Sequence, residues 1–205
     1  MEELKVRRFF YKNTRFKQAD LFLKQSYQEQ NPYLICKNFM QSRGLKQVHV
    51  YGETPLTELY SILIQMNLKK EDCFIDLGCG RGRNVFFVST VFNCECMGID
   101  IVPLFCKEAK KIAASLSHPP QFVCEDMSQA DLSEGTVLYF YALCLEENFL
   151  LSMIAKLETL QAGTKIITVS FPLSDYSKAF SLLFSKKASY PWGKTGLFVN
   201  VIIAN

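Results

Sequence analysis

Three glycines and two aspartates within 25 residues have the types and spacing of a nucleotide-binding turn. They are Asp76, Gly78, Gly80, Gly82 and Asp100. A short apolar run precedes each aspartate, and glycine lets the backbone turn sharply and approach a ligand without a Cβ. A strand, a glycine turn, a helix and a second strand ending in a carboxylate form a nucleotide-binding βαβ unit, in which the last carboxylate accepts hydrogen bonds from the ribose hydroxyls.

The spacing of the glycines separates two classes of cofactor. A dinucleotide fingerprint, G-x-G-x-x-G, would need its third glycine at position 83, which is Arg83. The chain instead has D-x-G-x-G-x-G from Asp76 to Gly82, a pattern that resembles the S-adenosylmethionine (SAM) methyltransferases. This resemblance implies SAM as the cofactor and methyl transfer as the reaction. Such a transfer is an in-line displacement in which the cofactor supplies the electrophile, so no metal site is expected.

The resemblance implies a partner for each part of SAM. Asp76 would meet the ammonium of the methionine end, directly or through water. Asp100 would bind the ribose, Asp126 would accept a hydrogen bond from the adenine amine, and Met127 would pack on the ring. Capping of a turn or helix is the alternative role for each of the three aspartates.

Residues 50–113 resemble one group within these enzymes, the non-SET histone lysine methyltransferases named for disruption of telomeric silencing. The discriminating segment is Tyr51-Gly52-Glu53-Thr54, since glycine turns occur across all SAM enzymes. The resemblance implies that Tyr51, Glu53 and Thr54 help to bind SAM and wall the substrate channel, with a protein lysine as the acceptor. An ordinary turn followed by a helix cap is the alternative for this segment. The predicted cofactor-binding residues are Glu53, Thr54, Asp76, Gly78, Cys79, Gly80, Gly82, Asp100, Ile101, Asp126 and Met127.

The residues expected next to the methyl acceptor differ from those of that group. Where the group has asparagines after the fourth strand, this chain has Tyr141-Ala142. Tyr139 or Tyr141 could line a channel for an amine with its ring face, or could be a core aromatic. Tyr51 and Tyr141 are the predicted catalytic residues, and residues 170–173 are predicted to form one edge of the acceptor pocket. The chain ends at Asn205 without the long accessory regions of the nuclear enzymes, which disfavours a nucleosome substrate.

Two other functions remain open at this stage. One is methylation of RNA or of a small molecule. Amino-methyltransferases that act on bases usually carry Asn/Asp-Pro-Pro-Tyr/Phe after the fourth strand, and residues 139–142 read Tyr-Phe-Tyr-Ala, which disfavours that subclass. The other is a non-catalytic SAM-binding module with a blocked acceptor channel.

Alternating strands and helices are expected to bring these residues together. Strands are predicted at 72–77, 95–100, 121–125, 136–141 and 165–171, and helices at 82–92, 103–116, 146–160 and 174–184. Nearly continuous apolar strands in such an alternation predict a parallel, doubly wound sheet covered on both faces. Two last strands, at 187–192 and 197–203 with a turn at 193–196, predict an antiparallel hairpin. The expected fold class is therefore α/β, with a Rossmann-like, mostly parallel sheet of seven strands.

The segment before this framework is predicted to be an accessory cap. We expect an N-terminal helical extension at residues 1–48 and the SAM-dependent methyltransferase domain at residues 49–205. Apolar spacing from Phe16 to Tyr27 predicts a helix that ends near Asn31-Pro32. Thr54-Pro55 predicts the start of the next helix, with the threonine hydroxyl as its N-cap and proline at its first position.

Composition places the chain among globular proteins. Its 205 residues are 49% hydrophobic and 21% charged, which suggests one domain with a substantial core. The eight cysteines lie mostly in apolar patterns and predict reduced thiols and a cytoplasmic location. His49 and His118 lack metal-ligand spacing, and no membrane span or signal peptide is expected. A net charge of +3 is too small to indicate nucleic-acid binding, and the basic N-terminal segment is expected to be a solvated face or a mobile arm.

Overall fold

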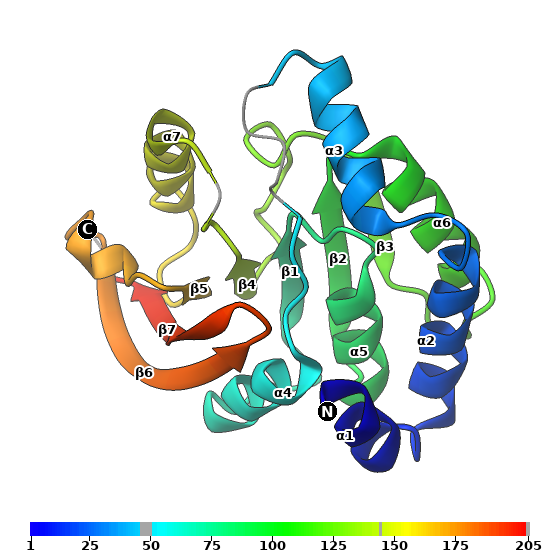
Figure 1. Cartoon of the computed structure of the whole chain (residues 1–205). Coiled ribbons are helices and arrows are strands. Elements are labelled where there is room, and N and C mark those ends of the chain that lie inside the picture. Colours follow the sequence, from blue (N-terminus) through cyan, green and yellow to red (C-terminus); the bar gives the residue numbers. More distant parts are fainter. Residues whose placement is uncertain (46–50, 144, 204–205) are drawn as a thin grey trace.

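The computed structural model describes residues 1–45, 51–143 and 145–203, which contain one seven-stranded mixed sheet flanked by helices (Figure 1). The strands are β1 (Cys73–Leu77), β2 (Glu95–Asp100), β3 (Gln121–Cys124), β4 (Val137–Phe140), β5 (Lys165–Val169), β6 (Phe180–Tyr190) and β7 (Gly193–Ile202). Their order across the sheet is β3-β2-β1-β4-β5-β7-β6. Strands β1 to β5 pair in parallel, whereas β7 is antiparallel to both β5 and β6. The predicted Rossmann-like architecture is confirmed.

The strand order reverses at β1, which has β2 on one side and β4 on the other. The chain proceeds from β1 through β2 to β3 and then crosses to β4. Open α/β sheets bind ligands outside the carboxyl ends of their strands at such a switch point. Asp76 of β1 and Asp100 of β2 both lie at this edge.

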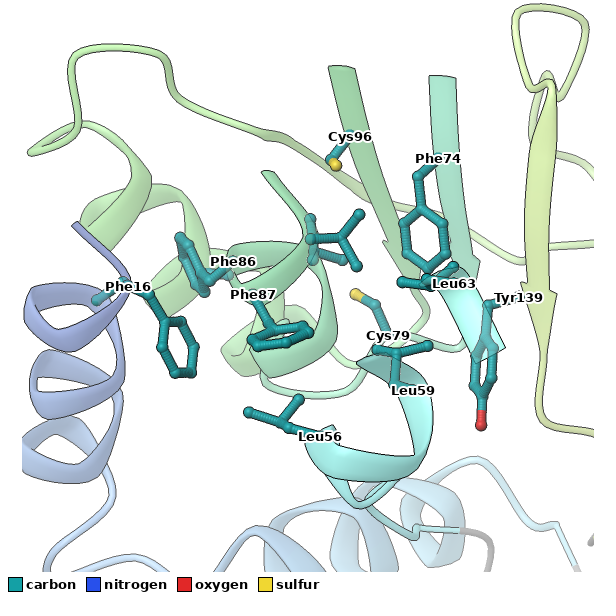
Figure 2. Close-up of a cluster of buried hydrophobic side chains, with 14 of the residues drawn as sticks. Phe16, Leu56, Leu59, Leu63, Phe74, Cys79, Phe86, Phe87, Cys96 and Tyr139 are labelled. Carbon is teal, nitrogen blue, oxygen red and sulfur yellow. The ribbon is translucent and has the colours of Figure 1, made fainter. Parts of the chain in front are cut away.

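Helices cover both faces of the sheet and bury two clusters of side chains. Helices α4 (Leu56–Gln65), α5 (Arg83–Val91) and α6 (Pro103–Ala113) contribute to the larger cluster, and α7 (Glu147–Leu157) contributes to the other. Side chains of β1 alternate between them, with Phe74 in the larger cluster and Ile75 in the smaller one. This alternation follows from the period of two in a strand. Figure 2 shows Leu59 and Leu63 of α4 near Phe74 and Tyr139, and Phe86 and Phe87 of α5 nearer to Phe16.

The N-terminal segment forms three helices, α1 (Glu2–Phe10), α2 (Thr14–Ser26) and α3 (Pro32–Ser42). Asn13 and Asn31 separate them, because each asparagine side chain accepts a backbone N–H of the helix that follows it. Val6, Phe10 and Phe16 are buried in the larger cluster. Helix α3 lies beyond the ends of β1 and β2 in Figure 1. The predicted boundary between residues 48 and 49, together with His49 and Val50, falls outside the described residues.

Two predictions of local structure near the C-terminus are wrong. The predicted helix at 174–184 is a short 3-10 turn, η1 (Leu173–Asp175), followed by β6. The hairpin is therefore longer than expected, and its turn lies at Pro191-Trp192 rather than at 193–196. The apolar run around residues 179–184 fits either a helix or a strand, and pairing with β7 along its length decides for the strand. Within the described residues, every helix is too short or too polar to cross a lipid bilayer.

Candidate functional site

A cavity of about 330 Å³ lies at the carboxyl ends of the parallel strands. Its wall combines α3, the segment before α4, and the loops that follow β1, β2, β3 and β4. The predicted site residues that line it are Tyr51, Glu53, Thr54, Asp76, Gly78, Cys79, Asp100, Ile101, Asp126, Met127 and Tyr141. Eleven of the thirteen predicted site residues thus meet at one place, although they are spread over 91 positions of the sequence.

Gly80 and Gly82 do not line the cavity, and the structure gives them a different role from the expected contact with a ligand. Both have positive φ angles, of 55° and 79°. A Cβ on Gly80 would lie 2.7 Å from Cε2 of Tyr51, and a Cβ on Gly82 would lie 2.4 Å from Cε1 of Phe122. These two glycines therefore admit neighbouring aromatic rings of the protein itself. Gly78, with φ of 78°, is the glycine of the turn that faces the cavity.

Asp76 is a buried acid, and one of its two carboxylate oxygens has no partner. It is 2% exposed, and its Oδ2 has no hydrogen bond among the described residues. Burial raises the pKa of Asp76 to about 7, against a lowering contribution from Asn84 and a further rise from Asp100. A buried unpaired carboxylate is costly. An ammonium group entering the cavity would remove that cost, so the site fits the cationic amino acid end of SAM.

Asp100 is also buried, but both of its carboxylate oxygens are bonded to the backbone. Its Oδ2 accepts the Gly80 N–H at 2.7 Å, and its Oδ1 accepts the Val102 N–H at 2.8 Å. Burial raises the pKa of Asp100 to about 6, and the backbone hydrogen bonds, from Val102, Gly80 and Ile101, lower it. Asp100 thus performs the capping role considered as its alternative. It also lines the cavity, and its carboxylate keeps lone-pair capacity for a ribose hydroxyl.

Tyr51 lies over the glycine turn and forms hydrogen bonds with both members of an ion pair, Glu53 and Arg81. Its hydroxyl donates to Glu53 Oε1 at 2.6 Å, and Arg81 Nε donates to the same oxygen at 2.8 Å. Arg81 also donates to the Tyr51 hydroxyl at 3.2 Å. The buried position raises the pKa of Tyr51 well above its usual value, and the neighbouring Glu53 adds to that rise. The ring packs between Tyr33 and Phe105, with centroids at 4.9 and 5.4 Å.

Arg81 is a site residue that the sequence reasoning missed. Its side chain is 13% exposed and forms an ion pair with Glu53. The signal was present, since Arg81 lies between two glycines of the turn and Glu53 belongs to the discriminating segment. Helix α3 supplies a second missed group: Cys36, Met40 and the nearby Leu45 line the cavity. No local pattern links α3 to the glycine turn, so only the tertiary structure identifies these side chains.

Thr54 and Tyr139 form a buried hydroxyl pair. The Thr54 Oγ1 and Tyr139 hydroxyl oxygens are 2.6 Å apart, and the Tyr139 hydroxyl is 3.2 Å from that of Tyr190. The prediction that Thr54 caps α4 is wrong, because Pro55 is the N-cap residue and no side chain caps that end. Tyr139 is 1% exposed, so it is a core aromatic whose hydroxyl end reaches the cavity wall.

Tyr141 is half-buried at the cavity wall. Trp192, from the turn between β6 and β7, donates its indole N–H to the Tyr141 hydroxyl at 3.1 Å. The Trp192 ring also stacks on Tyr190, with centroids 5.2 Å apart. Residues 170–173, which were expected at the edge of the pocket, do not line this cavity. Leu173 is instead fully buried in the smaller cluster, where its N–H donates to Asn200.

Asp126 and Met127 lie in a turn after β3 rather than in a helix. Asp126 Oδ1 accepts the Ser128 N–H at 2.8 Å, which is the capping role considered as its alternative. Met127 faces the glycine turn, since a Cβ on Gly78 would lie 3.5 Å from its Cε. Among the described residues, no three His, Cys, Asp or Glu side chains lie together as a metal site.

Parts of the sequence are similar to known methyltransferases. Residues 41–119 match the family model of histone methylation protein DOT1. The chain is 33% identical over 69 residues to the chloroplastic tocopherol O-methyltransferase of Arabidopsis thaliana, covering 33% of this chain and 20% of that protein. It is 26% identical over 135 residues to the H3 lysine-79 specific histone-lysine N-methyltransferase of Caenorhabditis elegans, covering 58% of this chain and 14% of that protein. The chain therefore spans a fifth or less of the length of these two relatives.

A solved structure extends the similarity to most of the chain. The RNA methyltransferase of Salinibacter ruber, in complex with S-adenosyl-L-homocysteine, superposes with a TM-score of 0.61 at 24% sequence identity. The match covers 75% of this chain and 95% of that one. The chain therefore has the fold of the class I SAM-dependent methyltransferases, and its residues 41–119 are similar to the DOT1 family.

Proposed function

We propose that this protein is a SAM-dependent methyltransferase and that its acceptor is a lysine side chain of a protein. The observation that carries the cofactor assignment is the unpartnered Oδ2 oxygen of Asp76, a residue in the wall of the cavity. A buried acid in a ligand pocket is stabilised by a cation, and SAM carries an ammonium and a sulfonium. The proposal includes a cap formed by residues 1–48 on a methyltransferase domain at 49–205.

The chain's own residues would bind and orient the cofactor. Asp76 would bind the ammonium and Asp100 the ribose hydroxyls, while Asp126 would accept from the adenine amine. Gly78, Cys79, Ile101 and Met127 would pack against the ligand. When bound, SAM supplies the methyl group as an electrophile. The protein has to align the acceptor lone pair with the methyl group and to exclude water.

Two observations support a lysine acceptor. The DOT1 match at residues 41–119 includes the discriminating segment at 51–54, whose Tyr51, Glu53 and Thr54 line the cavity. The cavity wall also has more carboxylates than cations, because six acids face it together with Arg81 and Arg83. The acids are Glu53, Asp76, Asp100, Glu125, Asp126 and Glu146. Such a wall attracts a cationic acceptor, and Tyr51 and Tyr141 are our candidates for the walls of its channel.

Methylation of RNA or of a small molecule is the second candidate. The observation that favours it is Tyr141, which stands where the resembled group has asparagines. The similarity to a tocopherol O-methyltransferase and to an RNA methyltransferase fold is consistent with either acceptor. We also propose a cytoplasmic location, which the free thiols of the seven described cysteines support.

Titration calorimetry and methyl transfer test the function in two steps. We expect SAM to bind, and label from tritiated SAM to appear in the protein fraction of a cell lysate rather than in its RNA or metabolite fractions. Acetylation of the lysines in that fraction should abolish the label. Label in RNA or metabolites would replace the acceptor assignment, and binding without transfer to any fraction would indicate a non-catalytic module. Absence of SAM binding would overturn the proposal.

A further inference from the structure

Lys156 binds a turn that is far from it in the sequence. It lies in the last turn of α7, where a lysine commonly interacts with the final carbonyls of its own helix. Here its Nζ instead donates to the carbonyl oxygens of Met127 at 3.1 Å and Ser128 at 2.9 Å, and also to that of Ala130. One ammonium group therefore uses its three donors on three carbonyls of the turn after β3.

The amide groups of the same turn are held from the other side by Asp126. Its backbone oxygen accepts the N–H groups of Gln129 at 2.9 Å and Ala130 at 3.1 Å. Its Oδ1 accepts the Ser128 N–H at 2.8 Å. Asp126 thus uses one carboxylate oxygen to bind the turn, while Oδ2 remains to accept a hydrogen bond from a ligand. The direction in which Oδ2 points depends on the conformation of the turn, which Lys156 stabilises.

Helix α7, which carries Lys156, is itself fixed by packing in the core. Met153, Ile154 and Leu157 are buried in the smaller cluster, and Met127 packs against the same cluster. The start of α7 also reaches the cavity, because Phe149 lines it. One helix therefore contributes a cavity wall near its start and holds the turn near its end.

We propose that Lys156 is a positioning residue for the adenine end of the cofactor site. It does not touch the ligand, and it acts by holding the turn so that Asp126 and Met127 face the adenine ring. The inference rests on the proposed function, since it assumes that SAM occupies the cavity. Charge-assisted hydrogen bonds are roughly twice as strong as neutral ones, so an uncharged side chain of similar length cannot replace this ammonium.

The test compares two ligands that differ only at the purine edge that carries the amine, that is, in the group on C6 and in the proton on N1. S-adenosyl-L-homocysteine has the amine that Asp126 would recognise, and S-inosyl-L-homocysteine has a carbonyl oxygen there. We expect the wild-type protein to prefer the adenosyl ligand by about 10-fold or more, as for one hydrogen bond to a charged group. In Lys156→Met this preference should fall to within about 3-fold, mainly through weaker adenosyl binding. Lys156→Arg, which keeps the charge and several donors, should restore most of the preference.

The matched control is Lys111→Met, because Lys111 also lies in the last turn of a helix, α6, and is exposed. It should keep the wild-type preference. A Lys156→Met protein that folds and keeps the full preference would overturn the inference, as would an equal loss of affinity for both ligands. If Lys156→Met does not fold, Lys156→Gln is judged by the same criteria. A wild-type protein that binds neither ligand would overturn the proposed function itself, which distinguishes the two failures.

Discussion

β1 and β2 each place an aspartate at the wall of the same cavity, but the two carboxylates differ in their hydrogen bonding. Asp76 has an oxygen without a partner, whereas each oxygen of Asp100 accepts a backbone N–H. Burial raises both pKa values, to about 7 for Asp76 and about 6 for Asp100. Asp100 is therefore part of the framework that it caps. Asp76 Oδ2, in contrast, is left without a partner by the fold, and we expect a ligand to supply one.

The glycine turn between the two acids is bonded to β2 rather than divided between the strands. The Gly78 and Cys79 N–H groups both donate to the Ile99 carbonyl at 2.9 Å, and the Gly80 N–H donates to Asp100. The end of β2 thus determines the conformation of the turn. The end of β1 contributes an acid whose removal should leave that conformation intact. Substitutions at the two strand ends should therefore differ in their effect on folding.

The largest effect is expected for Asp100→Ala. It leaves the buried N–H groups of Gly80 and Val102 unpaired, which should lower the free energy of unfolding by about 2–6 kcal/mol. It should also weaken SAM binding by at least about 100-fold, because the ribose loses its acceptor. Urea unfolding and titration calorimetry measure the two effects. Full stability together with unchanged SAM affinity would contradict both roles of Asp100.

Asp76→Asn should separate binding from folding. The amide is nearly isosteric but cannot pair with an ammonium as a charge, so SAM affinity should fall by about 10- to 100-fold. The free energy of unfolding should stay the same or rise, since an unpaired buried acid is removed. The control is Asp175→Asn, because Asp175 is exposed and does not line the cavity. Loss of stability comparable to that of Asp100→Ala would remove the distinction between the two acids.

The pH dependence of folding stability and of SAM affinity tests the same difference between Asp76 and Asp100 without a large structural change. Both folded-state pKa values lie above the usual 3.8, so between about pH 4 and 7 the folded protein binds more protons than the unfolded chain. These groups therefore stabilise the ligand-free fold most at low pH, and their contribution decreases as the pH rises. The ammonium of SAM should pair with the ionised form of Asp76 and not with the neutral form. The affinity of the protein for SAM should therefore increase from pH 5.5 to 7.5. Calorimetry across this range should show the increase in the wild type and little of it in Asp76→Asn.

The smallest effect is expected for Tyr51→Phe, at the residue that covers the turn between the two acids. The ring stays over Gly80, and only the hydroxyl contacts with Glu53 and Arg81 are lost. We expect SAM affinity within about 3-fold of the wild type and a stability change near 1 kcal/mol.

Tyr51→Ala should impair methyl transfer more than SAM binding, which a comparison of kcat with SAM affinity would show. Equal losses of both would assign Tyr51 to cofactor binding alone.

Much of the fold could be predicted from local patterns. The predicted strands that correspond to β1, β2 and β5 start within one residue of the observed ones, because buried strands and their flanking turns are encoded over a few residues. The prediction failed at 174–184, where the sequence permits a helix, and pairing with β7 makes the part from Phe180 onward a strand. The capping of α4 by Thr54 failed for a similar reason, since the hydroxyl of Tyr139, 85 residues away, pairs with it instead.

The sequence by itself determined the glycine turn, the aspartates at the strand ends and the order of elements, because each is a short pattern of residue types. Only the tertiary structure decided what each acid does. Asp76 and Asp100 follow similar apolar runs, and they differ because of neighbours that the fold brings to them. The ion pair of Arg81 with Glu53 and the reach of Lys156 to the turn after β3 likewise join segments 26 or more residues apart. Burial and hydrogen bonding depend on distance in space, which local sequence does not record.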